Sequence, residues 1–449
     1  MPYIDTALSI LTFLGVLIVL VLIHEVGHYV TARLAGVQVV EFGFGYPPRL
    51  FAIKRGGTEY SFNILPLGGF VKLVGEEDPT HPRSLARQPA WVRAIILTAG
   101  AGMNALLPVL LFTITAMVPQ SSISGDVRIL AVAPNSPAER AGLRPGDVVR
   151  EIAGEKVSRS AELSYLIQIN LGNPLQVVVR RDGEAKTFSG IVPRFNPPQG
   201  QGATGVIIRT GDLTVQDVAA GSPAAAVGLR PGDSIIQVNG EPLTTARAPL
   251  AALAPIDRGG DTSRRLDFLV ERNGKLQTVG GTLDNAPAAP GLAGIGLTMR
   301  EANVQSVALS KSFFEAVPYG AQRSVETLVL AKNTIVTWVS GTTAPQFAGP
   351  VGIAQMTGEV ASFGGILALM ELAALLSMNM AFFNILPIPM LDGGRLLFVV
   401  IEVVRGGKRI SPQRESFVHM VGFAVLIAMI VVVTYFDIAR LVRGESLLR

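Results

Sequence analysis

The stretch VLIHEVGHYV, residues 21–30, places two histidines and a glutamate inside a run of apolar side chains. Residues 8–23 are apolar enough to begin a membrane-spanning helix, and no loop separates them from His24, Glu25 and His28. An ionisable side chain in lipid is costly unless it has a partner, a water-filled cavity or a metal ion. The rest of the chain must therefore supply one of these three.

The composition indicates a membrane protein with several domains. Of 449 residues, 49% are hydrophobic and only 16% are charged, against about 25% charged residues in a typical soluble domain. The chain has no cysteine, which excludes disulfides, thiolate catalysis and cysteine-bound zinc. Any metal site must use His, Asp or Glu. The net charge of +4 is spread over many loops and gives no reason to expect nucleic acid.

Four segments are long and apolar enough to cross a bilayer, roughly residues 4–34, 92–118, 366–386 and 418–436. The first lacks the basic start and cleavage site of a signal peptide, so we expect a retained helix. Basic loops follow the first segment and precede the last, which predicts that both loops are cytosolic and the N-terminus is outside. The basic C-terminal tail argues weakly for the opposite orientation.

An internal repeat lies between the second and third segments. NSPAERAGLRPGD at 135–147 matches GSPAAAVGLRPGD at 221–233. Strand-like runs flank each copy, and Asp-Gly and Asn-Gly pairs predict tight hairpins. We expect two β-rich modules, residues 121–210 and 211–305, each with a short helix after Ser-Pro. They resemble PDZ domains of the bacterial protease-associated kind; the alternative is a generic β-sandwich repeat.

Residues 306–345 are predicted to contain an amphipathic helix at the membrane interface, with Trp338 near the headgroups. A fifth span is the alternative. This assignment leaves residues 1–120 and 346–449 as the two halves of a membrane domain.

The opening stretch has the pattern of a metal site. His24 and His28 are four residues apart, so they lie on one face of a helix, and Glu25 is offset from them around the axis. This is the H-E-x-x-H arrangement of zinc metalloproteases, in which the histidines bind zinc and the glutamate is the general base. The alternative is a pair of core histidines with Glu25 on a solvated face.

A third ligand is required, because catalytic zinc usually has three protein ligands and one open position. The other two histidines lie in a polar loop and at the start of the last span. Asp392 is the best candidate: it lies in the apolar stretch NILPIPMLDGGRLLF, residues 384–398, after two helix-breaking prolines. Gly393 and Gly394 are expected to let the chain turn tightly after it. The alternative is a turn aspartate that caps the next helix.

The combination of HEVGH at 24–28 with NILPIPMLDGG at 384–394 resembles the site-2 protease family of intramembrane zinc metalloproteases, and the two PDZ-like repeats resemble its bacterial RseP type. The resemblance covers essentially the whole chain. It implies that His24, His28 and Asp392 hold one zinc ion and that Glu25 is the base. The fold class it implies is mixed: a polytopic α-helical membrane core of about four helices, a re-entrant β-loop and two inserted PDZ domains.

The same resemblance suggests which residues contact the substrate. Residues 59–73 look like the re-entrant β-loop, and residues 347–355 match a Gly-Pro segment of the family. An extended loop can pair with an unwound substrate by β-strand addition. The alternatives are a hairpin that packs only on its own protein and, for Asn384, a helix C-cap. The predicted substrate-binding residues are Asn379, Asn384, Asn63, Pro66, Gly68 and Gly69.

The function implied is zinc-dependent cleavage of peptide bonds in or near the transmembrane segments of single-span membrane proteins, with anti-sigma factors or remnant signal peptides as the suggested substrates. We expect a multi-pass protein of the bacterial inner membrane. The PDZ pair should lie outside, where it binds peptides or excludes bulky substrates, and membrane lipids should surround the core. His28 precedes Gly36 by eight residues, about 12 Å of helix, so the site should lie nearer the cytosol.

Two alternatives predict other activities. Another family of membrane metalloproteases would use a glutamate as third ligand. A PDZ-bearing membrane scaffold or a metal transporter would have no proteolytic activity.

Overall fold

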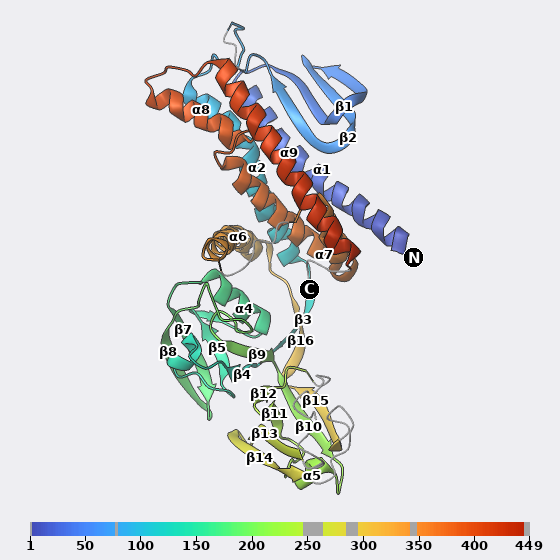
Figure 1. The fold of residues 1–449 in the computed structure, drawn as a ribbon, viewed down its shortest axis with the longest axis vertical. Helices are drawn as coiled ribbons and strands as arrows, with labels where there is room; N and C mark the ends of the chain where they lie inside the picture. Colours follow the sequence, from blue (N-terminus) through green and yellow to red (C-terminus); the bar gives the residue numbers. More distant parts are fainter. Residues whose placement is uncertain (1, 77–79, 246–263, 284–294, 342–347, 444–449) are drawn as a thin grey trace. The chain divides into compact units, whose positions relative to one another are not determined.

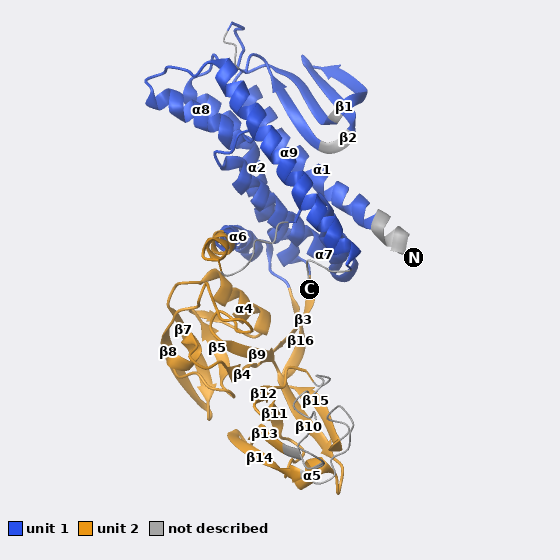
Figure 2. Ribbon diagram, in the orientation of Figure 1, with its two compact units in different colours: residues 1–118, 310–331, 345–449 blue, residues 119–309, 332–344 orange. Residues whose placement is uncertain are grey.

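The computed structural model describes residues 2–76, 80–245, 264–283, 295–341 and 348–443. The chain divides into two compact units (Figure 2). We call residues 1–118, 310–331 and 345–449 the helical unit, and residues 119–309 and 332–344 the sheet unit. The first unit contains the HEVGH stretch, and the second contains the repeat.

The helical unit is built on α1 (Pro2–Leu34), α2 (Ala90–Met117) and α7 (Pro350–Ile385), which pack against one another (Figure 1). The short helix α8 (Asp392–Val404) packs on α2, and α9 (Pro412–Val442) packs on α7. Among the described residues, four helices are long and apolar enough to cross a membrane: α1, α2, α7 and α9. This confirms the expectation of a multi-pass membrane protein with four apolar helices.

The third of these helices is longer than its hydropathy predicts. Helix α7 begins at Pro350, whereas the apolar segment begins at Ile366. Gly365, directly before that residue, has non-helical backbone angles of φ 63° and ψ −157°. Glycine adopts this region without the steric cost that other residues meet. The apolar segment is therefore the second part of a helix that is interrupted at Gly365.

A β-hairpin follows the first helix. Strands β1 (Val39–Arg55) and β2 (Thr58–Leu73) are long and bend, so that Phe42 pairs with Val71 on one side and with Tyr60 on the other. The Tyr60 hydroxyl hydrogen-bonds that of Tyr29 on α1, at 2.7 Å. Apolar side chains of the hairpin are exposed, as expected for contact with lipid: Leu50, Phe51, Ile53 and Ile64.

The sheet unit contains two sheets with the same strand order. In the first, β8-β7-β5-β4-β9 are neighbours and β6 pairs with β5; in the second, β14-β13-β11-β10-β15 are neighbours and β12 pairs with β11. Each copy of the repeat forms a short helix, α3 or α5, whose N-cap serine, Ser136 or Ser222, accepts a hydrogen bond from a backbone N–H of the first turn. Each sheet encloses its own apolar core.

The elements of the first sheet domain are β4 (Val127–Val132), α3 (Pro137–Arg140), β5 (Val148–Ile152), β6 (Glu155–Lys156), α4 (Ser160–Ile169), β7 (Leu175–Arg181), β8 (Glu184–Ile191) and β9 (Val206–Thr210). Those of the second are β10 (Asp212–Val218), α5 (Pro223–Ala226), β11 (Ser234–Val238), β12 (Glu241–Pro242), β13 (Arg264–Arg272), β14 (Lys275–Leu283) and β15 (Leu297–Ala302).

The two ends of the sheet unit pair with each other. Strand β3 (Gln120–Gly125) and strand β16 (Val304–Leu309) form an antiparallel ribbon in which Gly125 faces Val304. Helix α6 (Phe313–Val339) follows. It is not one of the four helices apolar enough to span a membrane, and its interfacial position stays a prediction.

Candidate metal and catalytic site

Helix α1 carries the three residues of the HEVGH stretch that were predicted to act together. His24 and His28 lie one helical turn apart, and their Nε2 atoms are 3.2 Å from each other. Only 9% of His24 is exposed to solvent. The Nε2 atoms of both imidazoles therefore point toward the same place inside the protein.

Asp392 is brought to this place by the turn between α7 and α8. Helix α7 ends at Ile385, and Asp392 is the first residue of α8. Met390 has a positive φ of 79°, and its N–H donates a hydrogen bond to Nδ1 of His419 on α9, at 2.9 Å. The turn is thus held by the last membrane helix.

The predicted role of the two glycines after Asp392 requires correction. Gly393 and Gly394 lie inside helix α8 and neither has a positive φ, so they make no tight turn. A Cβ at Gly393 would lie 2.1 Å from the carbonyl oxygen of Leu386, and one at Gly394 would lie 2.4 Å from that of Ile388. Their missing side chains instead allow the preceding turn to pack onto the first turn of α8.

The three predicted ligands converge. Oδ2 of Asp392 lies 3.1 Å from Nε2 of His24 and 3.2 Å from Nε2 of His28. Together with the His24–His28 separation, this makes a nearly equilateral triangle. Tetrahedral zinc with bonds of about 2.0–2.1 Å separates its ligand atoms by roughly 3.3 Å. The donor set and its spacing therefore fit a zinc ion with one position left open.

The other ring nitrogen of His28 also has a defined partner. Nδ1 of His28 lies 2.8 Å from the carbonyl oxygen of Ile96 on α2. A carbonyl can only accept, so Nδ1 carries the proton and Nε2 presents its lone pair, as metal-bound histidines require. Gly100, one turn further along α2, leaves room for the rings: a Cβ there would lie 2.4 Å from Nε2 of His28.

Glu25 lies beside the triad, next to the hairpin. A Cβ at Gly69 of β2 would come within 3.0 Å of Cγ of Glu25 and of Cγ1 of Val21. Residues 69–73 of β2 pair on one side with β1. The described structure shows no pairing partner on their other side. This unpaired end of β2 lies beside the predicted base, because Gly69 approaches Glu25.

The other predicted substrate-binding residues are distributed as follows. Asn63 is buried, and its Nδ2 donates to the carbonyl oxygen of Gly45, at 3.0 Å, inside the hairpin. Pro66 lies in β2, but its side chain is outside the part of the structure that is described. In α7, Asn379 is exposed and Asn384 is partly exposed. Their contact with substrate stays a prediction.

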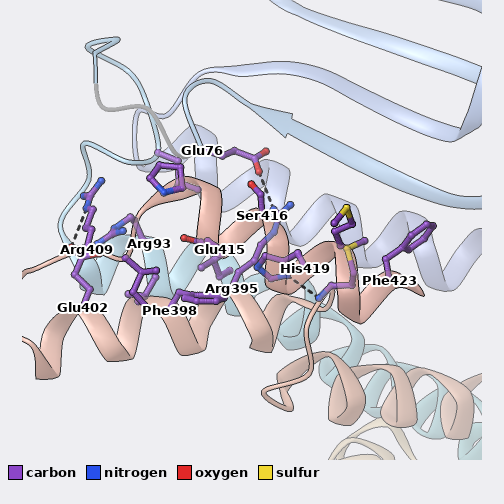
Figure 3. A pocket seen from close by; sticks show the side chains of 17 residues that line it. Glu76, Arg93, Arg395, Phe398, Glu402, Arg409, Glu415, Ser416, His419 and Phe423 are labelled. Carbon is purple, nitrogen blue, oxygen red and sulfur yellow. Dashed lines mark hydrogen bonds and ion pairs between the residues drawn. The ribbon is translucent and has the colours of Figure 1, made fainter. Parts of the chain in front are cut away.

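A separate pocket lies near the turn before Asp392. Its volume is about 600 Å³, and α8 and α9 provide much of its lining, including Arg395, Glu402 and His419 (Figure 3). Arg93 of α2 pairs with Glu402 at 2.7 Å, and Arg395 pairs with Glu76 at 3.0 Å. The pocket's lining does not include the three predicted metal ligands or Glu25, so it is distinct from the candidate catalytic site.

Comparison with known proteins identifies the family. The profile of Peptidase family M50 matches residues 12–429. The chain belongs to Peptidase family M50. This membership confirms the predicted family and the predicted class of enzyme, a metallopeptidase.

Curated relatives of this M50 peptidase are similar over nearly their whole length. The zinc metalloprotease RasP of Geobacillus kaustophilus is 30% identical, with 97% of this chain and 99% of the relative covered. Zinc metalloprotease RasP of Shouchella clausii is 28% identical, with 96% and 99% covered. The regulator of sigma-W protease RasP of Bacillus subtilis is 29% identical, with 98% and 99% covered. These names support zinc as the metal.

Two residues near the site, Gly100 and Asn104 of α2, were not predicted from the sequence. A signal for Asn104 was present: it is an amide inside an apolar span, and polar residues at membrane depth usually have a functional partner. Its partner could not be read from the sequence, because contacts between α1 and α2 are not local.

Proposed function

We propose that this chain is an intramembrane zinc endopeptidase in which His24, His28 and Asp392 hold the metal and Glu25 is the general base. The observation that carries the proposal is the convergence of two Nε2 atoms and one carboxylate oxygen, all within about 3.2 Å of one another, in the apolar core of an M50 peptidase. When both Nε2 atoms present lone pairs, these and the carboxylate charge repel one another at such separations, and a cation between them removes the repulsion.

With zinc bound, Glu25 would supply the proton transfers that hydrolysis of a peptide bond requires. A bound zinc ion supplies Lewis acidity, which polarises the scissile carbonyl and lowers the pKa of water to about 7. The Glu25 carboxylate accepts one proton from the attacking water as its oxygen bonds to the carbonyl carbon. Glu25 then returns that proton to the leaving amine nitrogen as the C–N bond breaks. The chain ends unchanged, and one water is consumed per bond.

We propose that the substrate is presented as an extended strand along residues 69–73 of β2. A peptide bond in a membrane helix is shielded by hydrogen bonds within the helix, so cleavage requires unwinding and new partners for the freed groups. The edge beside Glu25, unpaired among the described residues, offers such partners by β-strand addition. The amides of Asn379 and Asn384, together with Pro66 and Gly68 of β2, are proposed to add further contacts.

The environment proposed for the site is the bacterial inner membrane, with the catalytic end toward the cytosol. The four apolar helices and the basic loops favour this arrangement. The suggested substrates are single-span proteins, either anti-sigma factors or remnant signal peptides. One relative is named for regulation of sigma-W, which favours the first class.

We propose that the two sheet domains are PDZ domains on the extracytoplasmic side, where they bind a peptide or exclude bulky substrates. Their common strand order and the two Ser-Pro helix starts support duplication of one module. Strands β9 and β15 lie at the edge of their sheets, where a peptide strand could be added.

The experiment compares the unaltered chain with Glu25→Gln and Asp392→Ala. Each purified protein is incubated with a single-span substrate, and bound metal and the cut position are measured. We expect Glu25→Gln to retain zinc and lose cleavage, because the ligands remain and the base is absent. Asp392→Ala should lose zinc and cleavage together. Cleavage by Glu25→Gln at the normal rate would reject the base assignment, and a scaffold or transporter would show no cleavage in any variant.

A further inference from the structure

One face of α2 is shaped to fit the two imidazoles of α1. Ile96, Gly100 and Asn104 are spaced four residues apart, so they lie along one side of that helix. Ile96 contributes a carbonyl to His28, Gly100 contributes space, and Asn104 faces His24. The inference concerns the last of these contacts, and it rests on the proposed zinc site.

Asn104 is fully buried and its amide lies against the ring of His24. Its relative exposure is 0%, and its Nδ2 lies 3.4 Å from Nδ1 of His24. Among the described residues, its Oδ1 has no hydrogen-bond partner. A buried amide oxygen without a partner costs about 1–3 kcal/mol, so this atom requires an explanation.

The orientation of the amide depends on the tautomer of His24. With Nδ2 toward the ring, Asn104 donates, so Nδ1 of His24 must be the acceptor and Nε2 must carry the proton. Zinc at Nε2 requires the opposite tautomer, with the proton on Nδ1. Two N–H donors would then face each other. A half-turn of the amide about χ2 exchanges its oxygen and nitrogen and removes this conflict.

We propose that Asn104 is a positioning residue whose amide oxygen accepts a hydrogen bond from Nδ1–H of His24 in the zinc-bound enzyme. Asn104 then accepts the Nδ1–H of His24, as the Ile96 carbonyl accepts the Nδ1–H of His28. Both acceptors come from one helix and select the tautomer that presents Nε2 to the metal. The contact does not touch the substrate, and Asn104 acts only through His24.

A third helix contacts the backbone of α2 at Asn104. Oγ of Ser377 on α7 donates to the carbonyl oxygen of Asn104, at 2.8 Å, and both residues are buried. Helices α1, α2 and α7 therefore meet at the level of His24. The backbone from which the amide turns lies within helix α2 itself. Ser377 therefore supplies a control, because it contacts Asn104 without contributing an acceptor to the histidine.

The test compares Asn104→Leu, which has similar size and no acceptor, with Asn104→Asp, which keeps an acceptor and has no donor. Zinc affinity of the full-length, detergent-solubilised chain is measured by competition with a chelator, using zinc alone and no substrate. Loss of such a partner typically weakens metal binding about 10–100-fold, and we expect Asn104→Leu to fall in that range. Asn104→Asp should stay within a few-fold of the unaltered chain.

Ser377→Ala is the matched control and should bind zinc normally, because it loosens the same helix contact without altering the acceptor. Cobalt substitution gives a second readout: the visible spectrum of Asn104→Leu should change, whereas that of Ser377→Ala should not. Zinc affinity of Asn104→Leu equal to that of the unaltered chain would overturn the inference. Equal weakening by Leu and Asp would also overturn it, because the acceptor would not be what matters.

The failure of this inference can be separated from failure of the proposed zinc site. His24→Ala removes a ligand and should abolish tight binding. If His24→Ala binds zinc normally, the ligand assignment itself is wrong. If His24→Ala loses zinc and Asn104→Leu does not, the site stands and only the role of Asn104 is rejected.

Discussion

At the scale of single residues, the proposed metal site depends on the missing side chain of a glycine as much as on its predicted ligands. Gly100 of α2 faces the two imidazoles of α1, and a Cβ there would come within 2.4 Å of Nε2 of His28 and 2.7 Å of Nε2 of His24. Both nitrogens are proposed metal ligands. A single methyl group would therefore force the rings away from the positions in which their lone pairs converge.

We predict that Gly100→Ala weakens zinc binding by roughly tenfold or more, because overpacking of this size typically costs about 1–3 kcal/mol. Bound metal is measured after dialysis against a chelator. Gly102→Ala is the matched control: the same change is made two residues away, where no described atom lies within 4 Å of the added Cβ, apart from the neighbouring backbone of α2 itself. Equal zinc affinity of the two variants would show that Gly100 is not needed for space.

At the scale of elements, the ends of the membrane helices are joined by a buried carboxylate. Asp437 on α9 is 2% exposed, and its Oδ2 accepts a hydrogen bond from the backbone N–H of Gly352 in the first turn of α7, at 2.7 Å. Arg440 pairs with the same carboxylate. Cβ atoms at Gly349 and Gly352 would lie 2.7 and 2.9 Å from its oxygens, which explains both glycines of the Gly-Pro segment.

We predict that Asp437→Ala destabilises the helical unit, because α7 loses an N-terminal acceptor and Arg440 loses its partner. Removal of a capping acceptor costs about 0.5–2 kcal/mol, which should lower the midpoint of thermal unfolding by several degrees. Asp437→Asn retains an acceptor oxygen and should show a smaller decrease. An unchanged midpoint for Asp437→Ala would contradict this role of the carboxylate.

A helix or strand can be predicted from the sequence when the interactions that form it are local. The spans, the HEVGH helix and the two Ser-Pro helix starts are set by hydropathy, spacing and capping within a few residues, and the structure places them close to the predicted positions. The start of α7 at Pro350 was missed because residues before Gly365 are less apolar. The double pairing of β1 with β2 was missed because strand register is a non-local property.

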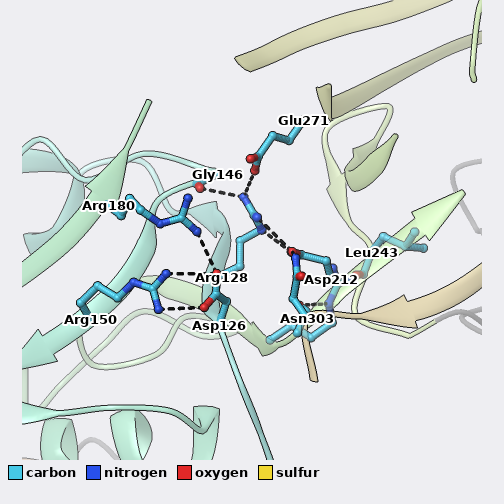
Figure 4. A network of polar contacts seen from close by, with 11 residues as sticks. Asp126, Arg128, Gly146, Arg150, Arg180, Asp212, Leu243, Glu271 and Asn303 are labelled. Carbon is cyan, nitrogen blue, oxygen red and sulfur yellow. Dashed lines mark hydrogen bonds and ion pairs between the residues drawn. The ribbon is translucent and has the colours of Figure 1, made fainter. Parts of the chain in front are cut away.

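At the scale of the whole molecule, a buried arginine joins the two sheet domains. Arg128 of β4 is 2% exposed and contacts Asp212 of β10 and Glu271 of β13 (Figure 4). Asn303 donates to Oδ2 of Asp212, at 2.6 Å. Burial raises the pKa of Asp212, but the hydrogen bonds and attraction from Arg128 lower it more, so that the net pKa lies below its usual value.

The sign of this shift predicts the pH dependence of the sheet unit. A carboxyl group whose pKa is lower in the folded state stabilises that state above its unfolded pKa of about 3.9, and the contribution is lost as pH falls below that value. We therefore predict that protection against hydrogen exchange in β4 and β10 of the full-length chain, corrected for the intrinsic exchange rate at each pH, is high near neutral pH and decreases below about pH 4.

Arg128→Met should speed exchange in both strands already at neutral pH, because breaking a buried pair typically costs about 3–5 kcal/mol. Arg150→Ala is the control, since Arg150 is far more exposed and pairs with Asp126 near the surface; such pairs contribute about 0–1 kcal/mol. If amide hydrogens in β4 and β10 exchanged equally fast in the two variants, Arg128 would not be the residue that stabilises the junction between the two sheet domains.

The paired ends of the sheet unit allow a clean test of its proposed filtering role. Because Gly125 of β3 faces Val304 of β16, residues 126–303 can be replaced by Asn-Gly, which favours a two-residue hairpin turn. We predict that this variant cleaves a single-span substrate with an intact bulky outer domain, which the full-length chain leaves uncut. Both proteins should cleave a substrate already trimmed outside. If the bulky substrate stays uncut by the variant, the filter proposal fails.

The family, the apolar helices, the duplication and the identity of the three candidate ligands can be predicted from the sequence alone, because each depends on residue type and short-range spacing. The folded chain was needed to show that Asp392 meets His24 and His28 across 364 residues, that Gly100 and Asn104 of α2 lie against the two imidazoles, and that Asp437 caps α7. These contacts arise from packing between helices, and no local pattern encodes which faces meet. The HEVGH stretch predicts the chemistry, and the packing of α1, α2, α7 and α8 brings its partners to it.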